Sequence, residues 1–116
     1  MIQIKSENFI VHLMRRFGVV GICIWPFIFI DPLSPDFTEN HELIHAAQIA
    51  ELWVVGFYIT YTLQFLGNFF FRYSFNYWKS YDNVLFEMEA YKYQRQPGYL
   101  KTRQPFAWKQ LKSERE

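Results

Sequence analysis

Cysteine is almost absent from this sequence, since Cys23 is the only one. A single thiol cannot form an internal disulfide, and it cannot build a zinc site made of several cysteines. Any metal that the chain binds must therefore be held by histidine and carboxylate side chains. Cys23 itself lies in an apolar run and is expected to be a small buried residue.

Basic residues are missing from the long stretch between Arg16 and Arg72. Residues 72–116 hold nine Lys and Arg against five Asp and Glu, whereas residues 1–71 hold three against six. The basic residues of the C-terminal part have no ordered spacing, and nucleic-acid binding usually needs a clustered basic patch. We therefore expect no nucleic-acid partner.

Two apolar runs, residues 17–30 and 52–71, bear on a membrane location. The first follows two arginines, as in a signal peptide, but ends in Asp-Pro without a small-residue cleavage site. The second has the length of a bilayer span, about 20 residues, yet it carries Gln64 and Asn68. We expect this run to be covered by protein or by a partner surface, in a protein that is cytoplasmic or peripherally associated with a membrane surface. The alternative is an integral membrane protein in which both runs form a two-pass hairpin.

The remaining patterns predict a single domain over residues 1–116, predominantly α-helical with a small β element, and therefore an α+β fold. Short β-branched and aromatic runs predict one or two strands within 18–30. Helical spacing and breaking residues predict helices over 6–17, from 36 or 38 to at least 55, over 83–96 and over 105–114. The residues expected to cap these helices are Ser6, Asp36 together with Glu39, and Ser80 or Asp82. The aromatic residues expected in the core are Phe57, Tyr58, Tyr61 and Phe65.

The stretch HELIH, residues 41–45, is the strongest chemical motif in the chain. His41 and His45 are four residues apart, so both lie on one face of the expected helix and can bind one metal ion. Glu42 projects to the side, where it can reach a water on that metal, as in the H-E-x-x-H arrangement of zinc-activated hydrolysis. The alternative is a helix that merely contains two histidines, but the chain has only three histidines, so a chance match is rare.

A catalytic zinc needs a third protein ligand and one open position. The segment FEMEAYKY, residues 86–93, offers Glu87 and Glu89 among apolar neighbours. A carboxylate buried in such a stretch is costly unless something pairs with it. Helical geometry alone does not separate the two glutamates as candidate ligands.

HELIH followed by EMEAY resembles the gluzincin zinc peptidases, and in particular the minigluzincins and their integral-membrane relatives. A similar pattern also occurs in other small bacterial proteins. The resemblance covers roughly residues 17–95 and implies a zinc metallopeptidase that acts on a peptide or protein. It implies Glu87 as the third ligand, and it puts Tyr91 where the membrane relatives have an aspartate that supports a zinc histidine. It also implies that an edge strand before the metal helix, here within 19–24, receives the substrate backbone.

The leading hypothesis is therefore a zinc-dependent metallopeptidase. His41, His45 and Glu87 would hold Zn²⁺, and Glu42 would act as the general base for the attacking water. The alternative is a catalytically silent metal-binding or membrane-associated interaction protein. The glutamate of the motif favours the enzyme, because a purely structural metal site has no need of Glu42.

Several further residues are candidates for supporting roles. Gln48 follows one turn after His45, where it either hydrogen-bonds the site or is part of a polar surface. Glu89, Gln48 and Tyr91 are the alternates to the assigned site residues. The residues that can be considered for stabilising the oxyanion, although their spacing marks out none of them, are Tyr91, Tyr93 and His12.

Overall fold

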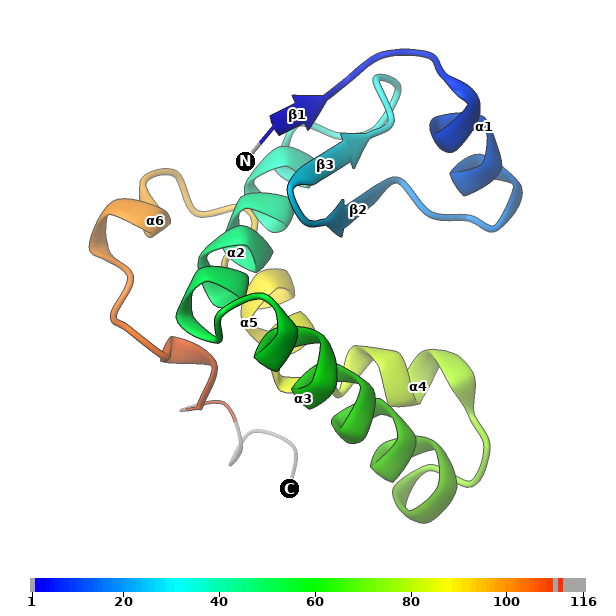
Figure 1. Cartoon of the computed structure of the whole chain (residues 1–116), viewed down its shortest axis with the longest axis vertical. Helices are drawn as coiled ribbons and strands as arrows, with labels where there is room; N and C mark the ends of the chain where they lie inside the picture. Colours follow the sequence, from blue (N-terminus) through cyan, green and yellow to red (C-terminus); the bar gives the residue numbers. More distant parts are fainter. Residues whose placement is uncertain (1, 110, 112–116) are drawn as a thin grey trace.

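The computed structural model describes residues 2–109 and 111, and within them the predicted mostly helical α+β fold is confirmed (Figure 1). Figure 1 shows the small sheet and α1 at one end of the molecule, α3 and α4 at the other, and α2 between them. The elements are β1 (Ile2–Ile4), α1 (Phe9–Arg16), β2 (Gly21–Ile24), β3 (Phe27–Ile30), α2 (Phe37–Glu51), α3 (Val55–Gly67), the π-helical segment η1 (Asn68–Arg72), α4 (Tyr77–Asp82), α5 (Leu85–Tyr93) and α6 (Tyr99–Thr102).

The sheet has the strand order β1-β3-β2. β2 and β3 form an antiparallel pair in which Gly21 lies opposite Ile30, and β1 runs parallel to β3. The two strands within 18–30 were expected, whereas β1 was not. β3 is the central strand because it pairs with both β1 and β2, and it carries the buried Ile28 and Ile30. Among the described residues β2 pairs with β3 alone, which makes it an edge strand.

The first helix begins later than expected. Its N-cap is Asn8, whose side chain accepts a hydrogen bond from the Val11 backbone N–H, and not Ser6. An asparagine oxygen at this position satisfies an otherwise free N–H of the first turn. The residues of α1 that enter the core are Val11 and Met14.

The helix α2, which carries HELIH, starts at Phe37, but the expected capping box is wrong. Asp36 has helical backbone angles, and its side chain makes no cap hydrogen bond. The helix also ends earlier than expected, because the chain turns at Trp53 and Val54, which both have positive φ. A positive φ is unfavourable for residues other than glycine. The turn at Trp53 and Val54 leads directly into α3, where Phe57 is buried in the core.

None of the described helices alone has both the length and the apolar character needed to cross a bilayer. By length and composition only, α2 and the helical stretch from Val55 to Arg72 meet that requirement together, with a bend of 111° between them. The expectation that the protein covers residues 52–71 holds for one side of this segment. Gln64 and Asn68 face inward, whereas Ile59 and Leu63 are exposed. Cover by a partner surface stays a prediction.

The second half of the chain differs from the expected helices in two places. An extra helix, α4, begins after Asn76, whose side chain accepts a hydrogen bond from Lys79. As a result α5 starts at Leu85 after Val84, so neither Ser80 nor Asp82 caps it, and it ends at Tyr93 and not at 96. Of the helix expected over 105–114, the structure has a short 3-10 turn at 107–109, and residues 110 and 112–114 lie outside the described residues.

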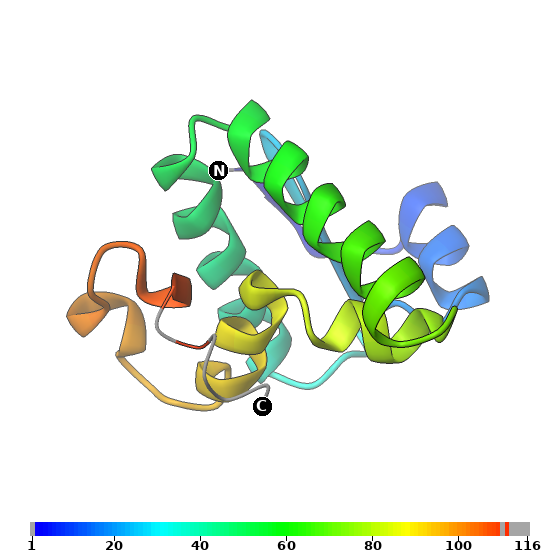
Figure 2. The ribbon, with the colours of Figure 1, turned by 90° about the horizontal axis from the view of Figure 1, so that it is seen from below.

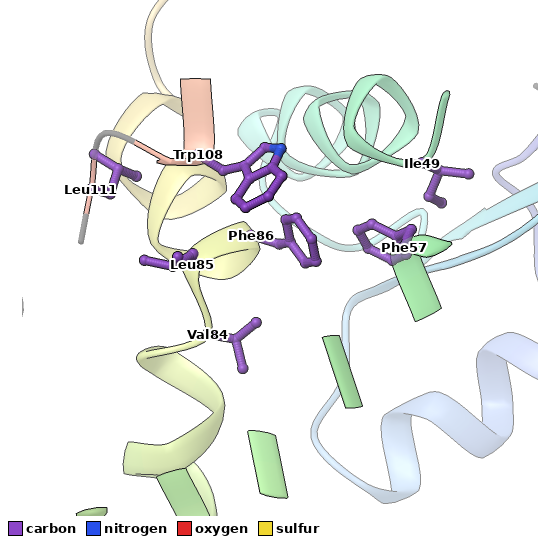
Figure 3. Packing of buried hydrophobic residues seen from close by; sticks show 7 residues of the cluster. All are labelled: Ile49, Phe57, Val84, Leu85, Phe86, Trp108 and Leu111. Atoms are coloured by element: carbon purple, nitrogen blue, oxygen red, sulfur yellow. The ribbon is translucent and has the colours of Figure 1, made fainter. Parts of the chain in front are cut away.

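An aromatic core joins α2, α3 and α5 (Figure 3). The Phe57 ring stacks on Phe86 with centroids 4.6 Å apart, and Trp108 meets Phe86 edge-on at 4.8 Å. Of the predicted aromatic stripe, Phe57 is buried, Tyr61 and Phe65 are partly buried, and Tyr58 is exposed. This packing holds α2 against α5, as predicted, and so sets HELIH beside FEMEAY (Figure 2).

Candidate metal centre

The three predicted ligands meet between α2 and α5. His41 Nε2 and His45 Nε2 lie 3.2 Å apart, and they lie 3.2 and 3.0 Å from Glu87 Oε1. All three side chains are buried. Zinc ligands at 2.0–2.1 Å in a tetrahedral site are about 3.3 Å from one another. The triangle of donor atoms therefore has the size of one face of a zinc coordination sphere.

Each candidate ligand is held by a second side chain on its other polar atom. Gln94 Oε1 lies 2.8 Å from His41 Nδ1, and Gln48 Oε1 lies 2.8 Å from His45 Nδ1. The Tyr61 hydroxyl donates to Glu87 Oε2 at 2.8 Å. Such contacts fix the ring orientation and the tautomer of metal-binding histidines.

The orientation of Gln48 can be deduced from its partners. Its Nε2 group donates to the Phe86 carbonyl at 3.0 Å and to Glu89 Oε1 at 2.9 Å, and both partners are acceptors. The amide oxygen must then face His45, so Nδ1 of that ring carries a proton and Nε2 is the nitrogen that faces Glu87. When Nε2 gives up the proton that it shares with Glu87, all three converging atoms can act as electron-pair donors, so the site fits a cation. Gln48 thus hydrogen-bonds the site and is not surface.

The charges around the triangle agree with this conclusion. Burial disfavours protonation of His45, but the neighbouring Glu87 carboxylate outweighs burial and raises the pKa to about 9. Burial would likewise raise the pKa of Glu87, but the two histidines outweigh it and hold that pKa well below the usual range. A buried carboxylate whose cationic partners among the described residues are two histidines lies at a position that a divalent cation can fill.

Glu42 lines the same cavity of about 450 Å³ as the three ligands. It is buried, and burial raises the pKa of its carboxyl group. Its carboxylate passes close to the backbone of β2, because a Cβ atom on Gly21 would lie 2.9 Å from Glu42 Oε2. The expected base Glu42 and the three expected ligands thus line the same cavity.

The two glutamates of α5 have different partners. Glu87 takes part in the triangle, whereas Glu89 accepts hydrogen bonds from Arg103 Nε at 2.5 Å and from the Tyr99 hydroxyl at 2.6 Å. Within the part of the chain that the structure describes, Gln48 is the side chain that links Glu89 to the site.

The remaining candidates separate by position. Tyr91 lines the cavity, with its ring 4.6 Å from the His41 ring, and it forms a hydrogen bond with Tyr81. Tyr93 stacks on Tyr99 at 4.1 Å, and the exposed His12 pairs with Glu7, so neither lines the cavity.

Sequence reasoning missed two residues of this site. Gln94 contacts His41 and so supports it. The resemblance gives this role to an aspartate, at the position that Tyr91 occupies in this chain. Gln94 follows Glu87 by two helical turns. This spacing could have identified it. Tyr61, which supports Glu87, was assigned to the core only, and nothing in the local sequence distinguishes it.

Aromatic side chains dominate the cavity wall. Glu42 and Glu87 are the only Asp, Glu, Lys or Arg residues among the described residues that line it, and β2 contributes one side. The aromatic residues of the wall besides Phe37 and Phe57 are Tyr58, Tyr61, Tyr77, Trp78, Tyr81 and Tyr91.

Comparison with known proteins gives no relative. A scan against protein-family models, a search of curated proteins and a search of solved structures each found no match.

Proposed function

We propose that this chain is a zinc-dependent metallopeptidase. The observation that carries the proposal is the triangle of buried donor atoms on His41, His45 and Glu87, with Glu42 facing the same cavity. Its donor set, two imidazoles and one carboxylate with one side open to a cavity, is the set that hydrolytic zinc enzymes use. A zinc ion held there would supply a Lewis acid that lowers the pKa of a bound water to about 7.

The chain's own residues account for the other steps. Glu42 accepts the proton of the attacking water and delivers it to the leaving amine. Tyr91, at the cavity wall beside His41, donates a hydrogen bond to the developing oxyanion. β2, an edge strand on the same cavity, offers backbone groups to an extended peptide. The proposed substrate is accordingly a peptide or protein segment, met in the cytoplasm or at a membrane surface.

Glu42→Gln is the decisive test, because glutamine keeps the shape of the side chain and cannot act as a base. Both the variant and wild type should bind one zinc per chain, and the variant should lose at least about 100-fold in turnover of a mixed peptide library. Glu39→Gln, on the same helix, is the matched control and should match wild type in both measurements. Zinc measured by mass spectrometry together with cleavage assays decides the outcome. If wild type binds one equivalent of zinc but cleaves no peptide, the proposal fails and the protein is a metal-binding protein without turnover.

A further inference from the structure

The outward side of α3 and η1 is apolar from end to end. Five residues at helical spacing are between 41% and 65% exposed, and these are Val55, Ile59, Leu63, Leu66 and Phe70. Trp53 before the helix and Phe71 near its end are 88% and 91% exposed. Figure 2 shows α3 on the outside of the molecule. A continuous apolar surface of this kind usually marks an interaction site.

The polarity of this helix is reversed relative to a helix that faces water. Its amide side chains turn inward, where Gln64 Oε1 accepts from the Leu85 N–H and Asn68 Nδ2 donates to the Ser80 carbonyl. Besides the apolar residues, Thr62 is exposed on this helix, whereas the Tyr58 hydroxyl is bonded to the Cys23 carbonyl of β2. A helix at a water surface normally presents its polar side outward. Polar groups turned into the protein with apolar groups turned out are typical of contact with lipid.

Charge is absent along the whole surface and returns at its end. Between Glu51 and Arg72 the sequence has no Asp, Glu, Lys or Arg. Arg72 is exposed at the end of η1, and Lys79 is exposed on the neighbouring α4. An interface with another protein usually has a polar rim around its apolar centre. An apolar surface with cations at one end instead matches the boundary between lipid chains and anionic headgroups.

We propose that the outward side of α3 and η1 binds the surface of an anionic lipid bilayer, with Ile59, Leu63 and Phe70 in the acyl region and Arg72 at the headgroups. The same helix lines the cavity of the metal centre through Phe57 and Tyr61. The bilayer surface therefore adjoins the cavity without covering the buried ligands. This inference does not depend on catalysis.

Flotation of the purified full chain with vesicles of phosphatidylcholine and phosphatidylglycerol tests the proposal. Wild type should float with the vesicles, and Leu63→Glu should lower the bound-to-free ratio at least tenfold because a charge enters the acyl region. Leu33→Glu makes the same change at a residue 80% exposed between β3 and α2, and it should leave the ratio within twofold of wild type. Ile59→Asn, a milder change on the same face, should also weaken binding.

Three outcomes would overturn the proposal. The first is wild-type protein that stays at the bottom of the gradient. The second is equal flotation of wild type and Leu63→Glu. The third is a lipid-free dimer in analytical ultracentrifugation that Leu63→Glu converts to monomer, because the surface would then bind a second copy of the chain. Circular dichroism and zinc content show whether each variant retains its fold, and neither measurement depends on lipid.

Discussion

Glu87 and Glu89 lie two residues apart on α5, and both are buried, but their negative charges are balanced in different ways. Glu89 faces Arg103, which also contacts Glu51 and is a permanent cation. Among the described residues, the cationic partners of Glu87 are His41 and His45, and each of these can be neutral. The Glu89 carboxylate therefore forms a complete structural ion pair. The other is balanced only when a proton or a metal ion is present.

Removing the permanent cation should have the largest effect. Arg103→Met leaves Glu89 buried without its arginine, and breaking a buried pair in this way costs about 3–5 kcal/mol of unfolding free energy. Urea denaturation of the zinc-free protein measures the loss. Lys101→Met, an exposed lysine of the same segment, is the control and should change stability little. A loss below about 1 kcal/mol would mean that Glu89 does not need Arg103.

Removing the carboxylate of the candidate metal centre should lower the affinity for zinc. Glu87→Gln should weaken zinc binding at least about 100-fold, or about 2.7 kcal/mol at 1.36 kcal/mol per tenfold change. Competition with a chromophoric chelator measures the affinity. Glu89→Gln is the matched change and should keep one equivalent of zinc while lowering stability. If Glu89→Gln releases zinc and Glu87→Gln retains it, the assignment is shifted by two residues.

Changing the glutamine that connects the surroundings of the two glutamates should have a smaller effect on zinc affinity. Gln48 joins His45 to Glu89, and Gln48→Met should lower zinc affinity about 10- to 100-fold because the His45 ring loses its fixed tautomer. Gln94→Met should act similarly through His41. Equal zinc affinity in wild type and both variants would show that the two amides do not orient the ligands.

A third carboxylate extends the comparison to pH and should give the smallest effect. Hydrogen bonds from Arg15, together with the Leu33 N–H, lower the pKa of Asp31 to about 2. A lowered folded-state pKa stabilises the protein above the unfolded-state pKa, and this contribution is lost as pH falls from about 4 through about 2. Asp31→Asn should therefore flatten the acid limb of a melting-temperature profile over this range. An unchanged limb would contradict the role of Arg15.

The sequence sufficed for the features that depend on local spacing. HELIH indicated which two histidines share a face, and the apolar surroundings of Glu87 and Glu89 indicated a second helix beside it. The choice between the two glutamates depends on Arg103, which is 14 residues beyond Glu89, and no local pattern carries that information. The resemblance had selected Glu87, which is the glutamate that lies with the histidines.

Features decided by distant packing were not predictable in this way. The end of α2 depends on Trp53 and Val54 adopting positive φ shortly before Phe57 enters the core, and neither residue is a glycine or proline that would mark a helix end in the sequence. The extra helix α4 was missed because an aromatic, polar connection gave no clear period before Asn76. Which residues of 52–71 face outward was not predictable, because the run has apolar residues on all sides and only the packing of α3 shows that Ile59 and Leu63 are exposed.

The absence of a side chain at Gly21 limits which substitutions this position can tolerate during evolution. Any side chain at that position would meet Glu42 Oε2 and the Thr38 methyl group at 2.9 and 3.0 Å. A substitution there would press on the expected base from a strand 21 positions earlier, while HELIH itself remained intact. If Glu42 acts as the proposed base, relatives with the proposed hydrolytic activity should therefore pair a glycine at this distance with the histidine motif. Relatives that have lost the glycine should also be free to lose the glutamate.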